Sequence, residues 1–130
     1  MKKNQKTSFF KTENIENLYL SYTSRQLKGK ILAPGDKSIS QRALIIALVS
    51  TGTTTIENIL EAEDVMHTKK AIQILGADIK ENKNNIINIE GIGLGNLMSP
   101  KKPIYMGNSG TGTRLLIGLV AGSNAIVTFY

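Results

Sequence analysis

The chain has 130 residues, of which 41% are hydrophobic and 20% are charged, and it contains no cysteine. This composition is typical of a globular domain with one apolar core, and it excludes disulfide bonds and cysteine-ligated metals. No apolar run reaches the roughly 18 residues that a membrane span requires, and no apolar segment of a secretory signal follows the first lysines. We therefore expect a cytoplasmic protein without membrane contact.

The net charge of +6 is concentrated near the N-terminus. Residues 1–37 contain eight lysines and arginines against three acidic residues, so the other 93 residues are nearly neutral. A basic leader of this kind is more often a solvated tail than a nucleic-acid arm. The chain also lacks aromatic residues interleaved with basic ones, the usual pattern for binding single strands. We expect no nucleic-acid partner, and a non-catalytic basic binding module stays open as an alternative.

Strands and helices alternate after a polar leader, residues 1–27, which has no sustained period. Hydrophobic periodicity and β-branched runs predict strands at 28–33, 53–59, 78–81 and 86–90, and helices at 38–51 and 62–75. Gly52 is expected to cap the first helix, while Glu61, Glu63 and Asp64 complement the dipole at the start of the second. The result is one β-α-β-α-β-β unit over about residues 28–90, in an α/β (α+β) fold.

A second unit begins after a glycine- and proline-containing loop at 91–103. We predict a strand at 104–106, a helix at 112–121 and a strand at 125–130, so this unit spans 103–130 and stops part-way. A unit that stops after its second strand leaves an unpaired sheet edge. We therefore expect a truncated domain at 28–130, with further chain in the complete protein.

The turn at Pro34-Gly35 leads directly into a helix whose first residues include Lys37, Ser38 and Arg42. Free backbone N–H groups at a helix start favour an anion, and arginine can bind one through two parallel hydrogen bonds. The spacing is not that of a Walker A loop, so ATP hydrolysis is not indicated. The alternative is a helix capped by Ser38 beside two solvated cations.

The same pattern recurs 72 residues later, at Gly107 to Arg114. An internal repeat indicates one supersecondary unit used more than once. Asn108, Gly110 and Thr111 then form a second turn in which backbone N–H groups approach a phosphate or carboxylate closely. The alternatives are a tight turn that requires glycine, and a structural role for Arg114 in place of an anion clamp.

His67 is the only histidine in the chain. It stands without cysteine or a cluster of acids, so we expect a surface or packing role and no metal site. The acids near residue 63 are better explained by the helix dipole than as a catalytic pair.

The two turns, 34–43 and 107–116, resemble those of the 5-enolpyruvylshikimate-3-phosphate synthases. The stretches 63–67 and 75–77 lie between them as they do in that family, and the resemblance covers about residues 28–130. It implies repeated β-α-β-α-β-β units in an inside-out α/β barrel, here incomplete. It also implies transfer of the enolpyruvyl group of phosphoenolpyruvate to the 5-hydroxyl of shikimate 3-phosphate, with release of phosphate and no cofactor.

The resemblance also assigns substrate contacts by position. Lys37 would contact both substrates, Ser38 and Arg42 would hold shikimate 3-phosphate, and Asn108 and Gly110 would meet phosphoenolpyruvate. At position 41, glutamine replaces the histidine common in the family.

The family's proton-transfer residues lie beyond this chain, so the resemblance assigns no catalytic residue within it. We expect the 130-residue chain to be inactive alone and the full-length enzyme to be a monomer. An enolpyruvyl transferase acting on a UDP-sugar is the enzymatic alternative, although the Asp-Lys-Ser turn argues against it.

Overall fold

The structure, a computed structural model, describes residues 28–31, 33–82 and 85–130. The predicted leader at 1–27 and part of the turn predicted near residue 83 therefore lie outside the described residues. The chain divides into two units, with the boundary between Ile31 and Leu32, and each is described by itself. Residues 28–31, the described part of the first unit, have no regular secondary structure.

The second unit has a mixed α/β fold, as predicted. Its helices and strands, in chain order, are α1 (Lys37–Val49), β1 (Thr51–Glu57), α2 (Glu63–Ile74), β2 (Asp78–Asn82), β3 (Ile86–Ile92) and α3 (Gly110–Ala121). Their types and order match the predictions, and each boundary lies within two residues of the predicted one. No helix in the described ranges is long and apolar enough to cross a membrane.

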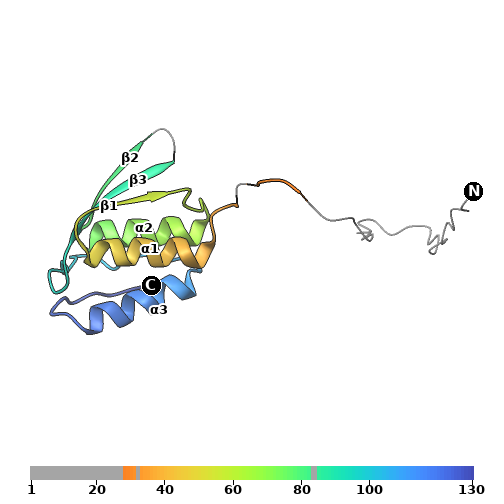
Figure 1. Cartoon of the computed structure of the whole chain (residues 1–130). Helices are drawn as coiled ribbons and strands as arrows, with labels where there is room; N and C mark the ends of the chain where they lie inside the picture. Colours follow the sequence, from red (N-terminus) through yellow and green to blue (C-terminus); the bar gives the residue numbers. More distant parts are fainter. Residues whose placement is uncertain (1–27, 32, 83–84) are drawn as a thin grey trace, which may run out of the picture. The chain divides into compact units, whose positions relative to one another are not determined.

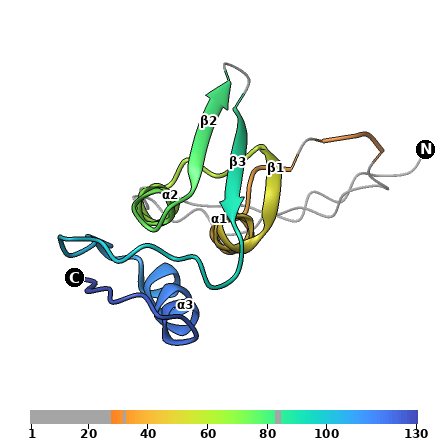
Figure 2. The same ribbon diagram turned by 90° about the vertical axis from the view of Figure 1, so that its left-hand side faces the viewer.

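The three strands form an antiparallel sheet in the order β1-β3-β2. Helices α1 and α2 lie side by side against one face of this sheet, and α3 lies beyond them, on the side away from the strands (Figures 1 and 2). The unit thus has a sheet layer, a middle layer of two helices and a third helix. Helix α3 contacts both helices of the middle layer.

Successive side chains of β3 alternate between the buried face of the sheet, which packs on the helices, and the opposite face. Ile89 on β3 is fully buried and pairs with Thr54 of β1 and Ile79 of β2. Leu44 and Leu48 of α1 are fully buried in the same apolar cluster. Burying each such side chain contributes roughly 1.5–3 kcal/mol. The remaining fully or nearly fully buried side chains of the cluster include Val65, Ala71, Ile72, Leu75, Ile87, Ile104, Met106 and Leu116.

Two predictions, the cap of the first helix and the first strand, were wrong. Gly52 does not cap α1, which ends at Val49 with Ser50 as its C-cap; Gly52 instead pairs with Gly91 inside the sheet. The strand predicted at 28–33 is absent from its described residues, and Ile31 is 94% exposed. A strand requires a hydrogen-bonded neighbour, and no described residue pairs with this segment.

The strands predicted at 104–106 and 125–130 were only partly right. The two segments meet in one parallel bridge, between Ile104 and Phe129. Backbone hydrogen bonds join Ile104 to Thr128 and Tyr130, and Met106 to Tyr130. Exposure alternates along 125–130, as in an extended segment with one side inward. The pairing is too short for a ladder.

Candidate functional site

The turn before α1 is held by the loop that follows β1. The side-chain amide of Asn58 donates to the Ala33 carbonyl at 2.9 Å, and the Leu60 N–H donates to Ser40 Oγ at 3.1 Å. A Cβ on Gly35 would lie 2.5 Å from the Asn58 carbonyl oxygen. Gly35 is therefore required by close backbone approach, and the loop fixes where α1 begins.

Asp36 caps α1. Its Oδ1 accepts a hydrogen bond from the Ile39 N–H at 2.8 Å, and its backbone is extended, as N-cap residues are. Ser38, the residue proposed above as an alternative cap, lies inside the helix. A carboxylate therefore already occupies part of this helix start, so an incoming anion must be bound mainly by side chains.

Lys37 and Arg42 supply positive charge at this end of α1. The Lys37 ammonium donates to Asp64 Oδ2 of α2 at 3.0 Å, with the two side chains 50% and 24% exposed. Arg42 is exposed and donates one bond, to the Ser38 carbonyl one turn earlier, at 3.1 Å. A guanidinium carries five N–H donors, so this bond leaves most of them available for an anion.

The start of α3 is arranged differently. Its N-cap residue is Ser109, with φ −76° and ψ 69°, and the described residues include no side-chain hydrogen bond that caps this helix. Gly110 is exposed, and a Cβ built on it would meet only the Arg114 guanidinium, at 3.7 Å. The space beside Gly110 is therefore open. The Gly110 N–H donates to the Asn108 carbonyl at 2.8 Å, so the next two N–H groups, those of Thr111 and Gly112, are the uncapped donors with which this helix start could bind an anion.

Gln41 connects the two helix starts. It is fully buried, and its side-chain amide donates to Ser109 Oγ at 2.8 Å. The same nitrogen lies 3.2 Å from the Asp64 carbonyl and 3.2 Å from Thr68 Oγ1. The buried Gln41 side chain thus connects two turns. One turn carries Lys37 and Ser38, and the other carries Asn108.

Sequence reasoning missed Asp64 and Gln41 as parts of this site. Asp64 was assigned only to the helix dipole, a placement that the structure confirms, since Glu63 and Asp64 occupy the first turn of α2. Its second role, as the partner of Lys37, depends on helix packing. Gln41 did carry a signal: it is a polar residue one turn after Lys37, beside the long apolar run that follows Arg42.

The packing role predicted for His67 is consistent with its contacts. The imidazole lies edge-on to the Tyr105 ring, with centroids 5.1 Å apart, and Tyr105 contacts Tyr130 in turn. A Cβ on Gly107 would lie 2.5 Å from the imidazole Cε1. His67 therefore supports the segment that enters the α3 turn.

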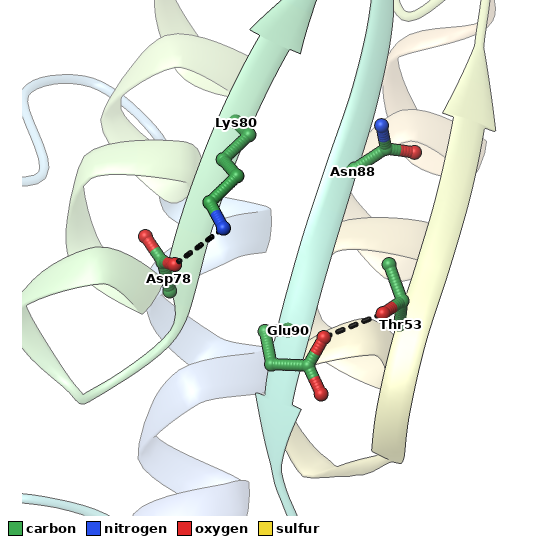
Figure 3. A pocket seen from close by; sticks show the side chains of 5 residues that line it. All are labelled: Thr53, Asp78, Lys80, Asn88 and Glu90. Atoms are coloured by element: carbon green, nitrogen blue, oxygen red, sulfur yellow. Dashed lines mark hydrogen bonds and ion pairs between the residues drawn. The ribbon is translucent and has the colours of Figure 1, made fainter.

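A hollow of about 280 Å³ lies elsewhere, on the outer face of the sheet (Figure 3). Its lining side chains are Thr53, Asp78, Lys80, Asn88 and Glu90. Two carboxylates oppose one lysine, and that lysine already contacts Asp78 at 3.6 Å. The hollow therefore suits an anionic ligand poorly, and the helix starts remain the candidate site.

Comparison with known proteins gives a consistent result. A family model described as EPSP synthase (3-phosphoshikimate 1-carboxyvinyltransferase) matches residues 22–130. The 3-phosphoshikimate 1-carboxyvinyltransferase of Zymomonas mobilis is 46% identical over 103 residues, which are 79% of this chain and 23% of that protein. The enzyme of the same name from Oceanobacillus iheyensis is 47% identical over 113 residues, 87% of this chain and 26% of that protein.

A solved structure is also similar. The structure of EPSP synthase from Acinetobacter baumannii matches with a TM-score of 0.70 and 38% identity, over 78% of this chain and 23% of that one. The chain thus spans about a quarter of the length of the curated relatives it matches.

Proposed function

The chain belongs to the EPSP synthase family, and we propose that it forms the part of a 3-phosphoshikimate 1-carboxyvinyltransferase that binds the anionic groups of both substrates. The reaction joins the enolpyruvyl group of phosphoenolpyruvate to the 5-hydroxyl of shikimate 3-phosphate and releases phosphate. The observation that carries this proposal is the pair of helix starts, one lined by cationic side chains and one uncapped, joined by Gln41.

Lys37, Ser38 and Arg42 hold shikimate 3-phosphate in this proposal. Arg42 has N–H donors beyond the one it gives to Ser38, and a bidentate pair with phosphate orients the ligand as well as binding it. To bind a substrate anion, the Lys37 ammonium has to leave Asp64 or contact both Asp64 and the anion. A half-exposed ion pair contributes only about 0–1 kcal/mol, so such an exchange costs little.

Phosphoenolpyruvate is assigned to the start of α3, beside Asn108 and Gly110, with Lys37 in reach of both substrates. Uncapped N–H groups and the helix dipole favour a carboxylate or phosphate there. Because Gly110 borders open space, a methyl group at this position takes volume from the ligand while leaving the fold intact. Preorganised donors of this kind stabilise charge without reorganising during the reaction.

The finer architecture belongs to the same proposal. The elements from α1 to β3 would belong to one repeat unit and 103–130 would begin a second, within an incomplete inside-out barrel that follows the leader at 1–27. The complete enzyme would be a cytoplasmic monomer that needs no cofactor, and the 130-residue chain alone would show no turnover, since its match covers only 23% of the Zymomonas mobilis relative.

A chimaera tests this function directly. Residues 28–130 replace the matching part of the Zymomonas mobilis relative, and phosphate release from phosphoenolpyruvate is measured with and without shikimate 3-phosphate. We expect release that depends on the second substrate. In the same chimaera, Gly110→Ala should weaken phosphoenolpyruvate binding about tenfold, the scale of a lost or crowded hydrogen bond.

Gly118→Ala is the matched control, because a Cβ there meets nothing within 4 Å and the residue lies in the same helix. A folded chimaera that releases no phosphate would contradict the proposed reaction. Equal phosphoenolpyruvate affinity in the Gly110→Ala and Gly118→Ala variants would contradict the assignment of the α3 turn.

A further inference from the structure

Ser109 occupies the N-cap position of α3 without capping it. Serine is among the best N-cap residues because its hydroxyl accepts a hydrogen bond from the second or third N–H of the helix. That geometry needs an extended backbone, which Asp36 has at the start of α1, with ψ 139°. Ser109 has ψ 69°, and no side-chain cap bond is found for α3 among the described residues.

The Ser109 hydroxyl is instead bound from the side by Gln41. The donor nitrogen lies 2.8 Å from Ser109 Oγ, and both side chains are buried, with exposures of 0% and 1%. The same nitrogen is held in place by Thr68 Oγ1 and by the Asp64 carbonyl, both on α2. The Gln41 side chain is therefore held in place by α2 and binds the N-cap residue of α3.

Gly112 makes room for this contact. A Cβ at that position would lie 2.5 Å from Thr68 Oγ1, 2.7 Å from Ser109 Oγ and 3.1 Å from the Gln41 nitrogen. All three are the polar atoms of the network, so any larger residue would separate α3 from Gln41. The glycine is required here by helix packing around Gln41, since its own helix position needs no unusual backbone angle.

The network has a cost that marks it as more than packing. The Gln41 carbonyl oxygen is buried and has no hydrogen-bond partner among the described residues. An unsatisfied buried acceptor is destabilising, and an apolar side chain of the same shape would avoid the penalty. A side chain kept in this position despite the penalty is explained if its N–H group performs a task.

We propose that Gln41 is a positioning residue that holds the Ser109 hydroxyl away from the start of α3, so that the second and third N–H groups of the helix stay open for phosphoenolpyruvate. This role rests on the proposed function, because it concerns the same anion site. It also makes a separate statement about the ligand-free chain: without Gln41, Ser109 turns to cap α3. The N–H groups of Thr111 and Gly112 then gain an acceptor.

The test uses Gln41→Met, which keeps the length of the side chain and removes its donor, in the 130-residue chain. Gln73→Met is the matched control, since Gln73 is exposed on α2. Water–amide exchange of Thr111 and Gly112 is followed by NMR without ligand. We expect exchange at one or both to slow about fivefold in Gln41→Met, the effect of a gained cap, and to stay unchanged in Gln73→Met.

The double variant Gln41→Met with Ser109→Ala removes the hydroxyl and should return the exchange to its original rate. A merely structural role for Gln41 predicts faster exchange along α3, the opposite direction, and unchanged rates would also overturn the proposal. These outcomes need no ligand. Phosphoenolpyruvate titrations then separate the two proposals. A native chain that does not bind phosphoenolpyruvate counts against the proposed function alone. An affinity for phosphoenolpyruvate about tenfold lower in Gln41→Met than in the native chain supports both proposals.

Discussion

The starts of α1 and α3 follow one sequence pattern, a glycine with an arginine seven residues later, yet they offer different donors to an anion. Asp36 caps α1, so an anion bound there, as we propose, would depend on the cationic side chains of Lys37 and Arg42. No side chain among the described residues caps α3, and the space beside Gly110 is open. A repeated motif can therefore keep its glycine and arginine while the capping of the two helices differs, with charged side chains at one turn and uncapped backbone N–H groups at the other.

The largest expected effect comes from removing the charge at the α1 turn. Lys37→Met in the chimaera should weaken shikimate 3-phosphate binding about 100-fold, because a charge-assisted hydrogen bond to phosphate is lost. Calorimetric titration measures the change. Lys69→Met is the control, since Lys69 also forms an ion pair, with Glu81, away from the site. Equal losses in the two variants would mean that Lys37 acts only through net charge.

The packing of α3 can be broken at one glycine and improved at another. Gly112→Ala should lower the free energy of unfolding by about 1–3 kcal/mol, because the new methyl group overlaps Thr68 and Ser109. Gly118→Ala should raise it by about 0.5–1 kcal/mol, since its methyl group meets no atom and alanine favours helix. Urea unfolding distinguishes the two. Similar changes in both variants would exclude a close α3 contact at Gly112.

The difference in capping can be measured at Asp36. Asp36→Ala should cost about 1 kcal/mol of stability through the lost cap of α1, whereas Asp36→Asn should change stability by only a few tenths, because asparagine caps equally well. Thermal unfolding of both variants gives the comparison. If Asp36→Asn were as destabilised as Asp36→Ala, charge and not capping would explain the role of Asp36.

The smallest effect on stability concerns the pair between Lys37 and Asp64. Asp64→Asn should change stability by less than about 1 kcal/mol, because the pair is partly exposed. It should also tighten shikimate 3-phosphate binding a few-fold by releasing Lys37. Asp78→Asn removes a comparable exposed pair, with Lys80 on the sheet, and should leave binding unchanged. Weaker binding in Asp64→Asn would show that Asp64 orients Lys37 for the substrate.

Much of the fold follows from local sequence signals. The helical periodicity of α1 and the β-branched run of β1 are strong, and both elements were predicted within two residues of their observed bounds. The errors arose where structure depends on a partner. The segment 28–33 has strand composition, but its described residues pair with no neighbouring strand. Gly52 was predicted to cap a helix, but it pairs with Gly91 in the sheet.

The site was predictable in part for the same reason. The sequence indicates Lys37, Ser38 and Arg42 because they cluster at one helix start. It indicates Gly110 because this residue lies in the second copy of the repeated turn. Gln41 and Asp64 become parts of the site only when α1, α2 and α3 pack together. No local pattern specifies which buried glutamine will reach a serine 68 residues away.

The claim that the two helix starts act as one site is tested most directly by titrating the isotopically labelled 130-residue chain with phosphoenolpyruvate and shikimate 3-phosphate together. We predict that backbone amide signals shift at residues 37–42 and at 108–114 with a common dissociation constant. Shifts confined to one turn would contradict the claim, as would shifts centred on the basic leader or on the hollow of the sheet. The absence of any shift at millimolar ligand would contradict it as well.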